Sequence, residues 1–256
     1  LLFCFAGAAQ SAGSILWSWT DNASNENGYR IMLGTTNLSG DLAANATSWL
    51  QTGLSTNTLQ SDLLAQAFTA GGSADSNTAS RYTLAAAPDE LGISEVWVTS
   101  ATVQWSPSSH PAGTLYTVLA STAANPSAAM GTVVSASSTY AVSLTSAGLR
   151  ADTTYYFQVQ AINNDAVATG YGPVVSTSTL AFPPVASSAT IAVSSIVFSW
   201  SANGNPPSTA YVGWISSDNV TFNETGGAAG TSVAISALLS NTTYYFRAQA
   251  VNNGNV

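Results

Sequence analysis

Hydrophobic and polar residues alternate over short stretches along the whole chain. Trp17 and Trp19 face one side of a predicted strand at residues 16–21, and residues 29–33 repeat the alternation. A period of two in segments rich in Thr, Val, Tyr and Ser is typical of β-strands. Helical periodicity is poor, so the pattern predicts an all-β protein.

One phrase of this pattern occurs three times. A Trp ends an apolar strand, a Tyr follows ten or eleven residues later, and a Thr- and Tyr-rich strand comes further on; the Trp–Tyr pairs are Trp19 with Tyr29, Trp105 with Tyr116, and Trp200 with Tyr211. A repeat of this kind fixes the architecture. It predicts three tandem domains at residues 1–85, 86–182 and 183–256, each with its Trp and Tyr in the core.

The third part of the phrase differs between copies. It is complete at residues 152–161 and 241–250, whereas the first copy has only Asn57-Thr58-Leu59-Gln60. The segment Trp-Thr-Asp-Asn-x-x-x-Glu-x-Gly-Tyr-Arg-Ile at 19–31 resembles the strand B to strand C segment of microbial fibronectin type III domains. The resemblance covers nearly the whole chain as three copies. It implies seven-stranded, immunoglobulin-like sandwiches without a disulfide, with Glu26 as a structural loop residue.

The resemblance also implies a corner tyrosine at the start of strand F. We expect it at Tyr156 in the second domain, whereas Leu59-Gln60-Ser61 occupies its place in the first. Trp97 is expected on the first strand of the second domain, packed in the core.

The two ends of the chain suggest an assembly. Few residues follow Ala250, so the third domain is predicted to lack its last strand, and residues 1–9 carry the apolar Leu1, Leu2, Phe3 and Phe5. Donation of this N-terminal strand to the open third domain of the next molecule would build a head-to-tail filament. Two other interpretations of residues 1–9 stay open: the first strand of the first domain, or a signal-peptide remnant. The alternative to the filament is that the chain is a piece of a longer protein, in which the last strand of the third domain lies outside the given sequence.

Charge is sparse in this chain. Only 6% of residues are charged, Lys is absent and the formal net charge is -8. A nucleic-acid partner needs a basic surface, and an anionic membrane surface attracts cations, so both are excluded, as is membrane insertion. The single Cys4 allows no disulfide within the chain.

A neutral surface rich in Ser, Thr and Asn has three open interpretations: glycosylation, association, or a secreted bacterial or archaeal lineage that tolerates such surfaces. The glycosylation candidates are Asn37, Asn45, Asn219 and Asn223, each in an Asn-x-Ser/Thr sequence. The expected partners are copies of the chain or other surface proteins, with glycans as a further candidate. The expected location is extracellular or at the cell surface.

No residue pattern predicts catalysis. His110 is the only histidine and has no positioned acid, and the carboxylates of Asp89, Glu90 and Glu95 indicate a solvated linker. The loop at residues 21–26 is oxygen-rich but lacks the spaced ligands of a helix–loop–helix calcium site. We therefore expect no catalytic residue, no metal and no cofactor.

Two residues of the third domain are predicted to face outward. Alternation over Tyr211–Ile215 places Val212 and Trp214 on the solvent side, where they are candidates for an exposed interaction surface. The predicted function is a non-catalytic, extracellular structural or adhesive rod, with the filament as its extended form. The alternative is a spacer or weak carbohydrate-binding region of a larger secreted polysaccharide-degrading enzyme.

Overall fold

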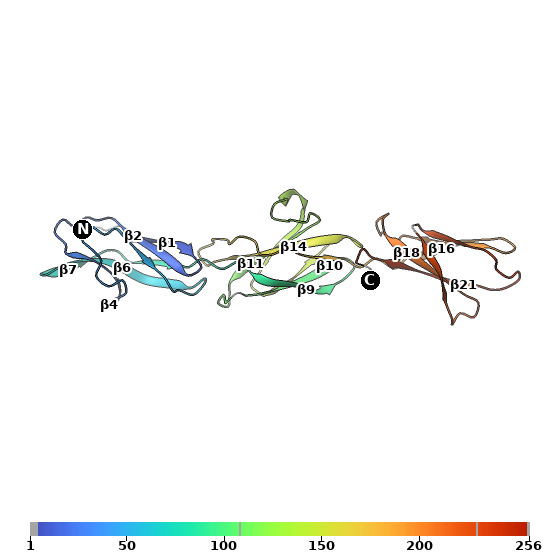
Figure 1. Ribbon diagram of the computed structural model, residues 1–256, viewed down its shortest axis with the longest axis horizontal. Helices are drawn as coiled ribbons and strands as arrows, with labels where there is room; N and C mark the ends of the chain where they lie inside the picture. Colours follow the sequence, from blue (N-terminus) through green and yellow to red (C-terminus); the bar gives the residue numbers. More distant parts are fainter. Residues whose placement is uncertain (1–4, 108, 229, 255–256) are drawn as a thin grey trace.

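The computed structural model describes residues 5–107, 109–228 and 230–254, and it confirms the all-β class. Its strands form three sandwiches, domains 1, 2 and 3, that follow one another in an extended row (Figure 1). A 3₁₀ turn at Met130–Thr132 is the helical element of the described residues. The domain boundaries predicted at residues 85/86 and 182/183 stay predictions.

Domain 1 has two sheets. The first, in the order β1-β2-β5, contains β1 (Phe5–Ser11), β2 (Ser14–Trp19) and β5 (Ser48–Gln51). The second, in the order β4-β3-β6-β7, contains β4 (Thr36–Asn37), β3 (Gly28–Leu33), β6 (Leu59–Thr69) and β7 (Gly72–Asp75), with β8 (Ala79–Tyr82) also on β6.

Domain 2 repeats this arrangement. Its first sheet, in the order β13-β10-β9, contains β9 (Asp89–Val96), β10 (Ser100–Ser106) and β13 (Ser143–Ala147). Its second, in the order β12-β11-β14-β15, contains β11 (Leu115–Ser121), β12 (Val133–Thr139), β14 (Thr154–Ile162) and β15 (Val175–Ser178).

Domain 3 has β16 (Val185–Ile191), β17 (Ile196–Ser201) and β20 (Ser232–Ile235) in the order β16-β17-β20. Its other sheet, in the order β19-β18-β21, contains β18 (Ala210–Ser216), β19 (Asn223–Ala228) and β21 (Tyr245–Val251). In the described part of domain 3, no strand follows β21, so nothing there takes the place that β15 has beside β14.

Each core is centred on the predicted Trp–Tyr pair. The ring centroids are 5.4 Å apart for Trp19 and Tyr29, 5.3 Å for Trp105 and Tyr116, and 5.7 Å for Trp200 and Tyr211, and all six side chains are buried. Tilted and edge-on contacts at these separations are favourable for aromatic rings. The prediction that these residues are core markers is confirmed.

Two predictions about aromatic residues of domain 2 are wrong. Trp97 is 60% exposed, because β9 ends one residue before it and the chain turns there towards β10. The corner tyrosine is Tyr155, whose hydroxyl accepts the backbone N–H of Arg150 at 3.0 Å, and not Tyr156. Tyr155 and Phe157 share the buried face of β14, whereas Tyr156 lies on the opposite face.

Candidate functional site: two interdomain junctions

Most of the buried polar side chains of the described residues gather where one domain meets the next; Ser121, Ser146, Gln158 and Ser216 lie elsewhere. We call the contact between domains 1 and 2 junction 1, and that between domains 2 and 3 junction 2. We call β6 of domain 1, β14 of domain 2 and β21 of domain 3 the F-type strands, because they correspond to strand F of the resemblance. At each junction, the turn before the F-type strand contacts two loops of the following domain. Buried polar groups cost free energy unless they are hydrogen-bonded, so the partners of these side chains define the contact.

An unusual backbone conformation places the central residue of each junction. Asn57 and Asp152 have φ values of 44° and 43°. Asn and Asp adopt this left-handed region more readily than other non-glycine residues. Their backbone N–H groups donate to the carbonyls of Leu84 and Leu180, at 3.1 Å in both cases. The turn is therefore tied to the end of its own domain and presents one side chain to the next.

Junction 1 joins the Asn57 turn to domain 2. Asn57 Nδ2 donates to Thr114 Oγ1 at 2.9 Å, and Asn57 Oδ1 accepts the backbone N–H of Asn164 at 2.9 Å. Asp165 adds a carboxylate that lies 3.5 Å from the guanidinium of Arg81. A buried amide with both ends paired in this way fixes how the two domains meet.

Junction 2 is built in the same way around a carboxylate. Asp152 Oδ2 accepts the hydroxyl of Thr209 at 2.6 Å, and Asp152 Oδ1 accepts the backbone N–H of Asn253 at 2.6 Å. The Asn253 amide also donates to the Asp152 carbonyl at 3.0 Å. Gly254 stands where Asp165 stands in junction 1, so that carboxylate is not repeated.

A second pair of contacts is also shared. Asn163 Nδ2 donates to the carbonyl of Thr83 at 3.0 Å, and Asn252 Nδ2 donates to that of Thr179 at 3.1 Å. The hydroxyl of each threonine donates to a carbonyl in the turn of its own domain, at 2.7 and 2.6 Å. Each Asn follows by two residues the alanine that pairs with the core tyrosine, so the two junctions use equivalent positions.

The linkers are held by a third equivalent pair. His110 Nε2 accepts the backbone N–H of Ala86 at 2.9 Å, and Asn205 Oδ1 accepts that of Phe182 at 2.7 Å. Because Nε2 accepts, the ring proton of His110 lies on Nδ1, which is 3.0 Å from the Tyr116 hydroxyl. The only histidine of the chain is thus a linker contact, which sequence reasoning missed.

Acid should weaken junction 1 through His110. Burial lowers the pKa of His110 below its usual value of 6.5, and the charge of Asp89 opposes this in part. Below pH 6.5 the unfolded chain therefore binds more protons than the folded one, and the free energy of unfolding falls as pH falls. Above pH 6.5, His110 is neutral in both states, and its full contribution to stability is present. Urea unfolding between about pH 7.5 and about pH 5 should show this loss in the wild type and a smaller loss in His110→Asn.

His110→Asn is the matched replacement because Asn205 has the same role in junction 2. At neutral pH the variant should unfold within about 1 kcal/mol of the wild type, the size of one net hydrogen bond. If the free energy of unfolding depends on pH in the same way for the variant and the wild type, His110 does not take up a proton on unfolding.

The predicted glycosylation candidates all lie on the surface. Asn37, Asn45, Asn219 and Asn223 are exposed, and Asn45 and Asn219 lie in turns with φ values of 60°. Exposure is what a glycan needs, and modification of these residues stays a prediction. Glu26 accepts the backbone N–H of Asn45 at 3.0 Å, in keeping with its expected structural role.

The predicted exposed surface on domain 3 is partly covered. Val212 and Trp214 are both only half-buried, but the guanidinium of Arg247 lies 5.2 Å from the centroid of the Trp214 ring and 4.2 Å from that of Phe222. Arg247 therefore stacks on the ring that a sugar would need. This observation disfavours Trp214 as a freely exposed stacking surface.

The predicted donor strand is only partly described. Leu1, Leu2, Phe3 and Cys4 lie outside the described residues. Phe5 begins β1, which pairs antiparallel with β2 of the same domain, with Phe5 opposite Trp19. In this structure, residues 5–11 are therefore the first strand of domain 1, one of the open alternatives, and this part of the segment is not a spare strand.

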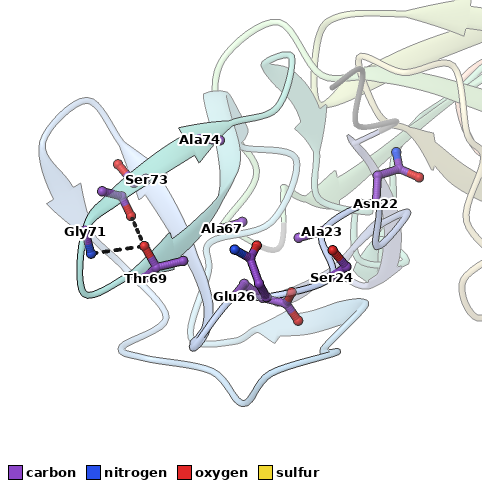
Figure 2. A pocket seen from close by; sticks show the side chains of 11 residues that line it. Asn22, Ala23, Ser24, Glu26, Ala67, Thr69, Gly71, Ser73 and Ala74 are labelled. Atoms are coloured by element: carbon purple, nitrogen blue, oxygen red, sulfur yellow. Dashed lines mark hydrogen bonds between the residues drawn. The ribbon is translucent and has the colours of Figure 1, made fainter.

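The outer end of domain 1 is hollow. The hollow has a volume of about 370 Å³. Figure 2 shows Asn22, Ser24 and Glu26 of the β2–β3 loop on one side of it, with Thr69 and Ser73 of the β6–β7 hairpin on the other. In domains 2 and 3, the corresponding loops hold the turn of the preceding domain. Across the described residues, no three His, Cys, Asp or Glu side chains gather as a metal site would require.

Comparison with known proteins identifies the middle of the chain. Residues 86–177 match the family model of the fibronectin type III domain. The chain is similar to the solved structure of the FN1–FN3 domains of chicken CNTN1, with 14% identity over 97% of this chain and 93% of that one, and a TM-score of 0.33. No curated protein matches the chain. None of the described segments forms a helix long and apolar enough to cross a membrane.

Proposed function

Because residues 86–177 match the fibronectin type III family model and the chain folds as three sandwiches in a row, we propose that it acts as a non-catalytic, extracellular rod that holds its two ends at a fixed separation. Domains of this type are generally non-catalytic and typically extracellular. A rod needs two properties: domains that fold independently, and joints that do not bend freely.

The observation that carries this proposal is the repetition of one joint. Domains joined by a linker move relative to one another unless the interface holds them. Asn57 and Asp152 occupy the same turn position, with the same backbone conformation, and each bonds a threonine and a backbone N–H of the next domain. Hydrogen bonds are directional, so repeating them repeats the angle between neighbouring domains.

The rod proposal does not depend on strand donation. Because β1 pairs with β2 at six positions from Phe5 to Ser11, donation of residues 1–9 would first remove the edge strand of domain 1. A spacer within a larger secreted enzyme would use the same fixed joints. The Arg247 guanidinium beside the Trp214 ring disfavours the other part of that alternative, a weak sugar-binding site at Trp214.

Small-angle X-ray scattering of the whole chain tests the rod. We expect one elongated particle whose maximum dimension is the same at low and high salt, because the central contacts are buried hydrogen bonds rather than exposed charges. A chain with Asn57→Ala and Asp152→Ala serves as the flexible reference. Scattering that needs a broad ensemble of bent shapes for the wild type, as for the reference, would contradict the proposal.

A further inference from the structure

Each junction has two halves. The turn half is the Asn or Asp with positive φ, as at Asn57 and Asp152. The loop half is the threonine that stands two residues before the core tyrosine, together with the Asn-Asn pair after the F-type strand: Thr114 with Asn163 and Asn164, and Thr209 with Asn252 and Asn253. Domain 2 carries both halves, and both are occupied.

Domain 3 carries a third turn half. Asn241 has φ of 54° and stands in Asn-Thr-Thr-Tyr-Tyr-Phe, where Asp152 stands in Asp-Thr-Thr-Tyr-Tyr-Phe. The turn is held by the corner tyrosine Tyr244, whose hydroxyl accepts the backbone N–H of Leu239 at 3.0 Å. Asn241 is exposed, unlike the buried Asn57 and Asp152. It lines a hollow of about 280 Å³ at the outer end of domain 3.

Domain 1 lacks the loop half. The register of β3 with β6 places Thr69 and Ala70 where the other domains have Asn-Asn, and Ala23 stands where they have His110 or Asn205. The Thr69 hydroxyl is already used within its hairpin, with Gly71 and Gly72 (Figure 2). At the positions of Asn163 and Asn164, domain 1 of a second copy therefore has no side-chain amide, and the contact that Asn163 makes with the Thr83 carbonyl could not be repeated there.

From these observations we propose that the Asn241 turn is a third junction face, whose partner is a fibronectin type III-like domain carrying a loop half of the domain 2 or domain 3 kind. This rests on the rod function proposed above and names the partner that would extend the rod. Asn241 Nδ2 donates to the partner's threonine hydroxyl, and Asn241 Oδ1 accepts the backbone N–H of its second Asn. Asn57 makes these same two contacts in junction 1.

The test extends the full chain by one repeat. A copy of residues 168–256 is joined after Val256, because Val256 aligns with Val167 in the repeat. The added residues give domain 3 the last strand and the linker that domain 2 has, and a second domain 3 follows them. With Cys4 replaced by serine, spin-label pairs report two distances: exposed Ala136 to exposed Ser217 across junction 2, and Ser217 to its copy across the new junction.

We expect the distance distribution across the new junction to be as narrow as that across junction 2. Asn241→Ala should broaden it, whereas Asn241→Asp, which restores the residue found at 152, should leave it narrow. Two results would overturn the inference and leave the rod standing, both with a narrow distance distribution across junction 2. One is a broad distribution across the new junction, and the other is a distribution there that stays narrow in Asn241→Ala. If junction 2 is itself broad, the rod function fails, and the inference with it.

Sedimentation velocity of the unextended chain tests whether the partner is instead a second copy. Because domain 1 lacks the loop half, Asn241→Ala should leave the concentration dependence of the sedimentation coefficient unchanged. End-to-end association that disappears in Asn241→Ala would assign domain 1 of another copy as the partner and overturn our assignment.

Discussion

Replacing Trp105 with alanine is expected to destabilise domain 2 by about 3–5 kcal/mol, the usual cost of removing a large buried aromatic side chain. Trp105 is 5% exposed and packs at 5.3 Å from Tyr116 in the centre of the domain 2 core. Domains of this size have total stabilities of about 5–15 kcal/mol, so the variant should retain little of its stability. Urea unfolding followed by tryptophan fluorescence and circular dichroism measures the loss.

Trp97→Ala is the matched control, because it removes the same side chain from the same domain at a site that is 60% exposed. Its effect should stay within about 0.5 kcal/mol, as for most surface substitutions. Similar losses for the two variants would contradict the assignment of Trp105 to the core. Because domain 2 supplies a half of both junctions, Trp105→Ala should also release domains 1 and 3 from their fixed arrangement.

Replacing Asp152 with alanine is expected to uncouple domain 3 from domain 2. The Thr209 hydroxyl and the Asn253 backbone N–H lose their shared acceptor, and leaving a buried donor unpaired costs about 1–3 kcal/mol. Part of this cost is avoided if the junction opens to water, so we expect both lower stability and looser domains. The rate of amide hydrogen exchange at Asn253, whose N–H is bonded across the junction, should rise by about tenfold for each 1.4 kcal/mol lost.

Asp152→Asn controls for this prediction, because Asn57 fills the same position in junction 1. An amide there can donate to the Thr209 oxygen and accept the Asn253 N–H, so the junction should survive. If Asp152→Ala exchanges no faster than the wild type at Asn253, the carboxylate does not hold the junction.

The cores could be predicted from the sequence because their signals are local. Alternation places Trp17 and Trp19 on one face of β2, and both are buried. Two aromatic residues of domain 2 were misplaced, one from the resemblance and one from its expected place on the first strand. Trp97 continues the apolar pattern beyond the end of its strand, and the choice between Tyr155 and Tyr156 depends on which face of β14 is buried.

The junctions could not be predicted in the same way. Their Asn-Asn pairs stand two residues beyond the repeated phrase, and in an Asn-rich chain such a pair suggests an ordinary turn. Asn57 contacts Thr114 and Asn164, far away in sequence and in another domain, so its role appears only when the domains are placed together. A signal was nevertheless present, because the Asn-Asn pair recurs at residues 163–164 and 252–253.

The interpretation of the N-terminal segment shows the same limit. An apolar stretch of this kind suits a donated strand, a signal-peptide remnant or an edge strand equally well. Pairing of Ala8 with Leu16 and of Gly7 with Trp17 makes residues 5–11 part of domain 1, a register that depends on backbone contacts rather than on composition.

The central claim is that equivalent buried contacts fix the three domains in one arrangement. Residual dipolar couplings of backbone N–H groups in a weakly aligned medium test it most directly, because they report the orientation of every domain in one frame. We expect a single alignment tensor to fit domains 1, 2 and 3 in the arrangement of Figure 1. Three tensors of different magnitude, one for each domain, would show that the junctions do not hold and would contradict the account.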